Sequence, residues 1–139
     1  MRTLCGLLMM TLLFAGCNKK TAGEEDNFVY ISGSGLTGKW VAKERFISPG
    51  AGGTWNSLPR DQWFILEFRS DGSFTYSSNF HKADSLFSRY RISGNLILVS
   101  NADSTKTDTW HFQLVGGERL ELSTVLCFEG CPWGLRRIQ

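Results

Sequence analysis

The agreement between glycine-marked turns and the apolar alternation around them constrains this chain more than any other feature of its sequence. A two-residue loop at 94–95 sets Ile92 opposite Ile97, and three-residue loops at 70–72 and 116–118 act in the same way on their own neighbours. The opposed apolar pairs are Ile92 with Ile97, Tyr90 with Val99, Phe68 with Phe74, and Leu114 with Leu120. Because successive side chains of a strand point to opposite faces, the three hairpins predict one shared apolar interior.

Eight strands are predicted, and they occupy most of the chain after residue 38. Their ranges are 39–48, 63–69, 73–79, 88–93, 96–100, 106–115, 119–126 and 133–138. Short turns alternate with longer links, so an up-and-down meander would have a pinched end and a loop-rich mouth. The longer links are 49–62, 80–87, 101–105 and 127–132. We therefore expect an all-β, eight-stranded antiparallel up-and-down β-barrel, which has room for side chains or one small ligand.

The N-terminus is typical of an export signal. A positively charged start precedes an apolar run over 4–15, which is shorter than the roughly 20 residues that span a membrane. The order LFAGC at 13–17 resembles the lipobox of bacterial lipoproteins, with Phe14 where leucine is usual. The resemblance implies a cleaved signal peptide over 1–16 and acyl chains on Cys17, which would anchor the protein to a bilayer.

Composition and the residues that follow the lipobox predict where the protein lies. Residues 17–37 are mostly polar or small, which predicts a flexible tether ahead of a barrel domain at 38–139. Asn18 stands where lipoproteins kept at the inner membrane often carry aspartate, so the resemblance implies the outer membrane of a Gram-negative cell envelope. A net charge of +2 provides no basic field for nucleic acid. We expect a monomer.

Two glycine motifs resemble nucleotide-binding loops, but their context argues against that function. Gly33, Gly35 and Gly38 match GxGxxG, and residues 33–40 match GxxxxGK[ST] except at Trp40. A phosphate loop needs a strand before it and a helix after it, because the N-terminus of the helix binds the anion. Here a tether precedes and a strand follows, so we expect no nucleotide cofactor.

Residues of the first and last predicted strands, expected together at the pinched end of the barrel, resemble a known family. Gly38, Lys39 and Trp40 look like the GxW signature of lipocalins, and Arg137 matches the arginine that this family stacks across the tryptophan. The runs SDGSF, YRISG and CFEGC resemble those of small bacterial lipocalin-like (calycin) lipoproteins. The resemblance implies that Trp40 and Arg137 close the barrel, and it leaves the ligand undefined.

Cysteine and histidine usage predicts structural roles. With one of the four cysteines in the signal peptide and Cys17 lipidated, Cys127 and Cys131 remain. In an oxidising envelope these two are expected to form a disulfide, with a free redox pair as the alternative. His81 and His111 lack the spacing of a zinc site, and no nucleophile or acid/base constellation is evident. We expect neither a metal nor an enzyme.

The alternation also suggests ligand contacts. The aromatic residues predicted to line the interior as walls are Phe46, Phe64, Tyr76, Tyr90 and Phe112. Glu44 falls on the same face, as a polar ligand contact, as a charge paired inside the barrel, or turned to solvent by a local bulge. Trp55, in the link at the mouth, is interpreted as a lid, a partner anchor or simple rim packing.

Two functions remain open at this point. In the first, a membrane-anchored barrel binds a small apolar ligand in or at its mouth. In the second, aromatic side chains fill the barrel, which acts through its rim loops as an interaction, inhibitor or envelope-adaptor module. A void of roughly 300 Å³ or more would favour the first function, and a packed interior the second.

Overall fold

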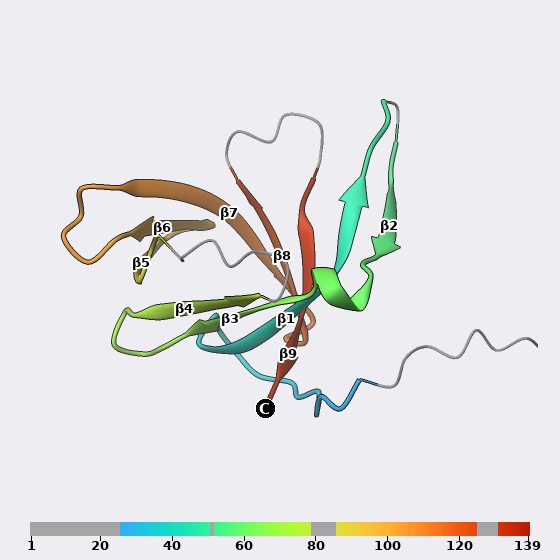
Figure 1. The fold of residues 1–139 in the computed structure, drawn as a ribbon, viewed down its shortest axis with the longest axis horizontal. Helices are drawn as coiled ribbons and strands as arrows, with labels where there is room; N and C mark the ends of the chain where they lie inside the picture. The colour runs from blue at the N-terminus through green and yellow to red at the C-terminus, as the bar shows by residue number, and fades with distance from the viewer. Residues whose placement is uncertain (1–25, 51, 79–85, 125–130) are drawn as a thin grey trace, which may run out of the picture.

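In the computed structural model, which describes residues 26–50, 52–78, 86–124 and 131–139, the chain forms a nearly closed antiparallel β-barrel (Figure 1). Its elements are β1 (Gly38–Ile47), β2 (Thr54–Ser57), the 3₁₀ turn η1 (Arg60–Gln62), β3 (Phe64–Phe68), β4 (Phe74–Ser78), β5 (Arg89–Ser93), β6 (Leu96–Ser100), β7 (Thr107–Val115), β8 (Arg119–Thr124) and β9 (Trp133–Ile138). The signal peptide, the lipidation site Cys17 and the Cys127 half of the expected disulfide lie outside the described residues.

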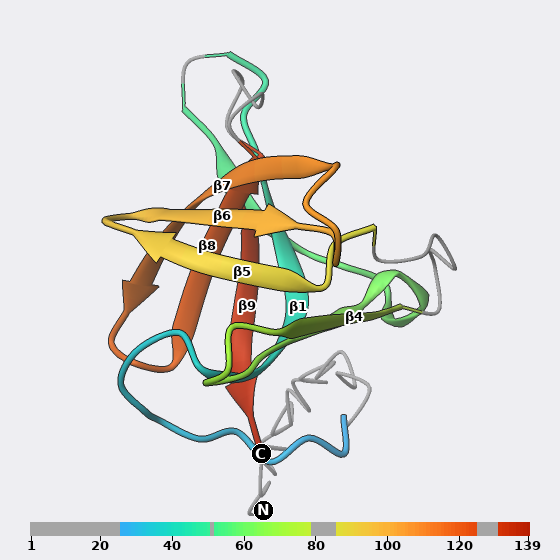
Figure 2. The same cartoon turned by 90° about the vertical axis from the view of Figure 1, so that its left-hand side faces the viewer.

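Eight of these strands form the barrel as an up-and-down meander, as predicted. The strand order is β4-β3-β1-β9-β8-β7-β6-β5, so the first strand pairs with the last and each remaining neighbour is next in the chain (Figure 2). The ninth, β2, pairs only with the end of β1. Together they project beyond the barrel mouth as a hairpin (Figure 1). The sequence prediction treated this stretch as part of a loop over 49–62, and that assignment was wrong.

The three predicted hairpin registers are confirmed. Ile92 pairs with Ile97, Phe68 with Phe74, and Leu114 with Leu120. The turns use glycines with positive φ, at 80° for Gly72, 61° for Gly94 and 63° for Gly116. Turn geometry and apolar alternation therefore agree throughout the closed end of the barrel, which is the end that carries these turns.

The barrel has one weak seam, between β4 and β5. Ser73 and Arg89 form an isolated bridge there, with Phe74 N donating to Ser88 O at 2.9 Å and Tyr90 N to Gly72 O at 2.8 Å. Beyond Tyr90, β5 continues past the turn that ends β3. Ile92 was predicted to face the interior, but it is 47% exposed because no strand covers it on that side.

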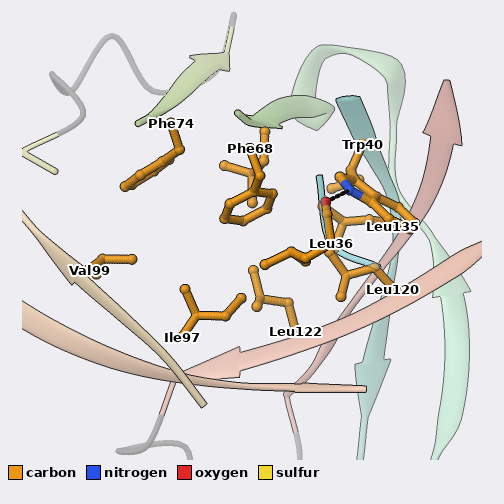
Figure 3. Close-up of a cluster of buried hydrophobic side chains, with 11 residues drawn as sticks. Leu36, Trp40, Phe68, Phe74, Ile97, Val99, Leu120, Leu122 and Leu135 are labelled. Atoms are coloured by element: carbon orange, nitrogen blue, oxygen red, sulfur yellow. Dashed lines mark hydrogen bonds between the residues drawn. The ribbon is translucent and has the colours of Figure 1, made fainter. Parts of the chain in front are cut away.

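The closed half of the barrel is filled by a single apolar cluster (Figure 3). Its buried members are Leu36, Trp40, Ala42, Leu66, Phe68, Phe74, Ile97, Val99, Leu120, Leu122 and Leu135. They come from β1, β3, β4, β6, β8 and β9 and from the segment before β1. Burial of such side chains, at about 25 cal/mol per Å², provides the main stabilisation of the fold.

Arg137 closes the barrel as the sequence predicted. It pairs with Trp40 across the β1–β9 ladder, and its guanidinium lies 4.3 Å from the centre of the indole ring. It also donates to the backbone carbonyls of Thr37, at 2.7 Å, and Gly35. Burial lowers the pKa of this guanidinium from its ordinary value. The Trp40 indole N–H in turn donates to Leu36 O at 2.8 Å.

The segment 26–37 is part of the barrel rather than a free tether. Tyr30 bridges to Ile138, and Ile31 N donates to Arg137 O at 3.2 Å. Leu36 is only 3% exposed and packs within the apolar cluster beside Trp40 (Figure 3). The sequence prediction of a flexible tether over 17–37 was therefore wrong for residues 26–37, which are held by backbone hydrogen bonds that no local pattern encodes.

Candidate ligand cavity

A cavity of about 500 Å³ opens at the mouth of the barrel, above the apolar cluster. Its apolar wall comes from five strands and consists of Phe64, Leu66, Tyr76, Trp110, Leu122 and Trp133. Polar side chains at its rim include Arg45, Gln62, Asp108 and Thr124. A largely apolar pocket with a few polar groups is the usual form of a small-molecule site.

Aromatic contacts fix the shape of the wall. The Phe64 ring lies 5.4 Å from that of Tyr76 and 5.2 Å, edge on, from that of Trp133. Opposite them, Trp110 makes an edge contact of 5.7 Å with Phe74 in the core. Because each ring is held by another ring, the cavity is preformed. The entropic cost of ordering its walls on ligand binding should therefore be small.

A β-bulge in β1 decides which side chains reach this cavity. The β1–β9 register shifts between Ala42 and Glu44, so Lys43 is the extra residue. Lys43 and Glu44 consequently both face outward, and both line a separate hollow on the outer face of the barrel. The next residue, Arg45, faces the cavity at its mouth, where its guanidinium lies 5.0 Å from the centre of the Trp133 ring.

Glu44 therefore does not face the interior, contrary to the alternation read from Trp40. The structure shows the third alternative, in which a local bulge turns the side chain outward, and there the carboxylate forms an ion pair with Arg119 rather than with a partner inside the barrel. The Arg119 guanidinium also lies 4.2 Å from the centre of the Trp55 ring. Trp55 thus packs on Arg119 and Phe46 outside the barrel and does not form a lid over the mouth.

The other predicted contacts divide between the cavity and the rest of the barrel. Phe64 and Tyr76 line the cavity as predicted. Phe46 instead packs on Trp55 at 5.3 Å, within the projecting hairpin. Tyr90 lies toward the closed end, where its ring contacts Phe68 at 5.0 Å and its hydroxyl donates to Arg69 O at 2.7 Å. Phe112 packs against the core cluster.

Sequence reasoning missed the polar groups of the cavity. Asp108 precedes Trp110 by two positions on β7, so it shares the inward face, and this signal was available in the alternation. Its carboxylate accepts the Trp110 indole N–H at 3.0 Å and the Thr109 backbone N–H at 2.7 Å. Arg45 and Gln62 had no such signal, because the first depends on the bulge and the second on the η1 turn.

The outer hollow next to β1 contains a second charged cluster. Lys43 pairs with Asp26 and donates to the Tyr30 hydroxyl at 3.0 Å, and that hydroxyl donates to Asp26 at 2.5 Å. Burial alone would raise the pKa of Asp26, but the hydrogen bonds from Lys43 and Tyr30 outweigh it and lower that pKa. Burial would lower the pKa of Lys43, and the same partners raise it. The cluster fastens the segment 26–37 to the barrel.

The described residues contain no group of three or more His, Cys, Asp or Glu side chains that could hold a metal ion. Among the same residues, no helix is long and apolar enough to cross a membrane. Comparisons with family models, curated proteins and solved structures gave no significant match, so the description of this site depends on its geometry and chemistry.

Proposed function

We propose that this protein binds a small, mostly apolar ligand in the cavity at the barrel mouth. The observation that carries the proposal is the cavity of about 500 Å³, which exceeds the roughly 300 Å³ at the lower end of ligand pockets. The packed cluster below it limits the depth, so a ligand would occupy only the upper half of the barrel.

The alternative, an interaction module that acts through its rim, has one observation in its favour. The β1–β2 hairpin projects beyond the mouth, and Ile47 on it is 50% exposed (Figure 1). Its two aromatic residues, however, pack on each other and on Arg119 rather than presenting a free surface. The cavity therefore carries more weight than the hairpin.

The place of the protein in the cell is part of the proposal. The lipobox-like LFAGC order supports lipid attachment at Cys17, and the Trp40–Arg137 closure agrees with the lipocalin resemblance. Metabolic labelling with an alkyne analogue of palmitate, with Cys17→Ser as the control, would test the attachment directly.

Occlusion of the cavity tests the binding function. Thr124 is exposed at the mouth and lines the cavity, so Thr124→Phe places a ring in the void at little cost in folding. Thr75 on the outer face of β4 provides the matched control, Thr75→Phe. Every variant is built in the full chain with Cys17→Ser, which removes the proposed acylation site, is purified without detergent, and is titrated with the neutral fluorescent probe N-phenyl-1-naphthylamine. We expect Thr124→Phe to weaken probe binding at least about tenfold, or about 1.4 kcal/mol, and Thr75→Phe to leave it unchanged.

The outcome separates the two functions. Saturable binding that only the cavity variant weakens supports the ligand-binding proposal. Absence of saturable binding, or equal loss in the two variants, would overturn it and favour the rim module. Native mass spectrometry of protein isolated from its own envelope would then identify a carried ligand or a bound partner.

A further inference from the structure

We propose that the ligand is an anionic amphiphile, with an apolar tail in the cavity and a carboxylate or similar head group bound by Arg45. This inference rests on the proposed function and names its ligand class. The ligand class is inferred from the charged groups at the mouth, because the apolar wall alone does not distinguish one apolar molecule from another.

Arg45 is the group that sets the charge preference. It lines the cavity, and within the described parts of the chain it forms no ion pair and donates no side-chain hydrogen bond. By contrast, Arg119 and Arg69 are paired with carboxylates, and Arg137 is held by backbone carbonyls. The Arg45 guanidinium therefore has its donors available to a bound molecule.

Trp133 positions this guanidinium. The 5.0 Å separation from the ring centre holds the Arg45 head group against the cavity wall, where its edge is free to donate two parallel hydrogen bonds. Carboxylates and phosphates accept such a pair of hydrogen bonds. Lysine at this position would keep the charge but lose the fork.

Asp108 is the counter-argument, since a carboxylate also lines the cavity. Its oxygens already accept the Trp110 indole N–H and the Thr109 backbone N–H, and it lies beyond ion-pair distance of Arg45. It would repel an anion placed on the β7 side of the mouth. The head group is thereby directed to the β1–β9 side, where Arg45 lies, and the tail to Phe64 and Leu66.

Three twelve-carbon compounds that differ only in the head group test this inference. Dodecanoate, dodecanol and dodecyltrimethylammonium, each below its micelle concentration, compete with N-phenyl-1-naphthylamine for the full chain. We expect dodecanoate to displace the probe at about a tenth of the dodecanol concentration, because only the carboxylate accepts charge-assisted hydrogen bonds from the Arg45 guanidinium. The ammonium compound should compete least.

Arg45→Met should lower the affinity for dodecanoate to that for dodecanol, and it should leave the affinity for dodecanol unchanged. Arg91→Met, on the outer face of β5, is the matched control and should retain the full preference. Arg45→Lys should keep part of it. Because Arg45 is exposed and dodecanol reports on the intact cavity, a folding defect is recognised at once.

The results distinguish failure of this inference from failure of the proposed function. Equal competition by dodecanoate and dodecanol in the unmodified protein, or tighter binding of the ammonium compound, would overturn the anionic preference and leave ligand binding intact. If none of the three compounds competes and the probe itself does not bind, the proposed function fails as well.

Discussion

At the residue scale, the segment with Gly33, Gly35 and Gly38 binds a cation, whereas its GxGxxG pattern is typical of loops that bind anions. GxGxxG loops bind anions through backbone N–H groups. Here the carbonyls around Gly35 and Thr37 accept hydrogen bonds from the Arg137 cation. A Cβ at Gly33 would lie 3.2 Å from that guanidinium, and one at Gly38 3.0 Å. Gly33 and Gly38 therefore leave the space that lets the chain pass close to the Arg137 side chain.

The two adjacent arginines of β9 allow a test of how much the hydrogen bonds between Arg137 and the backbone carbonyls stabilise the barrel. Arg137 is buried and bonded, whereas Arg136 is exposed and lies 3.9 Å from Glu118. We expect Arg137→Lys to lower the free energy of unfolding by about 2 to 3 kcal/mol, because the fork of hydrogen bonds to carbonyls is lost. Arg136→Lys should change it by less than about 0.5 kcal/mol. Urea denaturation of the two variants measures the difference. Equal effects of the two substitutions would contradict a stabilising role of the Arg137 hydrogen bonds.

At the scale of elements, the sequence predicted what turn chemistry and alternation determine together. The hairpin registers around Gly72, Gly94 and Gly116 were predictable because glycine marks each turn and apolar pairs verify it. The bulge at Lys43 was not predictable, because its cause is the register against β9, far along the chain. Of the seven predicted ligand contacts, alternation placed only Phe64 and Tyr76 correctly in the cavity wall. Beyond the bulge, alternation assigned Glu44 to the interior in place of Arg45.

The contacts that hold the segment 26–37 on the barrel should depend on pH. Asp26 has a lowered pKa in the folded protein, so its contribution is present above about 3.8 and is lost as the pH falls through the folded value. Lys43 has a raised pKa, so its contribution is present below about 10.5 and is lost as the pH rises through the folded value. The segment should be held most firmly between these limits.

Hydrogen exchange provides the measurement. The amides of Ile31 and Gln139, which donate to Arg137 O and Val29 O, report on this attachment. We expect their protection factors to fall as the pH is lowered from 6 through the folded pKa of Asp26, by about fivefold in all, since a partly exposed ion pair contributes about 1 kcal/mol. In Asp26→Asn the protection should already be low at pH 6 and change little. An acid response of equal size in that variant would show that another group is responsible.

At the scale of the whole molecule, neighbouring strands of the barrel pair along most of their length, except between β4 and β5. The first and last strands share a long register from Lys39 to Arg45, whereas β4 and β5 meet only around Ser73 and Arg89. Barrel closure removes edge strands, which otherwise offer unpaired backbone groups. The seam is therefore the place where this barrel should open first, and it lies toward the closed end, away from the cavity.

A cross-link tests both parts of this argument. Ser73 and Arg89 form a non-hydrogen-bonded antiparallel pair, whose Cα atoms lie about 4.5 Å apart, within the range of a disulfide. We expect Ser73→Cys with Arg89→Cys, once oxidised, to raise the free energy of unfolding by about 3 kcal/mol, as a bridge closing a loop of this length should. Probe affinity should stay within about twofold, because the cavity walls lie on the mouth side. The single variant Ser73→Cys and the unmodified protein, each with and without reductant, control for the native cysteines. If the bridge forms but does not slow unfolding, the seam is not where unfolding begins. If it weakens probe binding, the cavity and the seam move together.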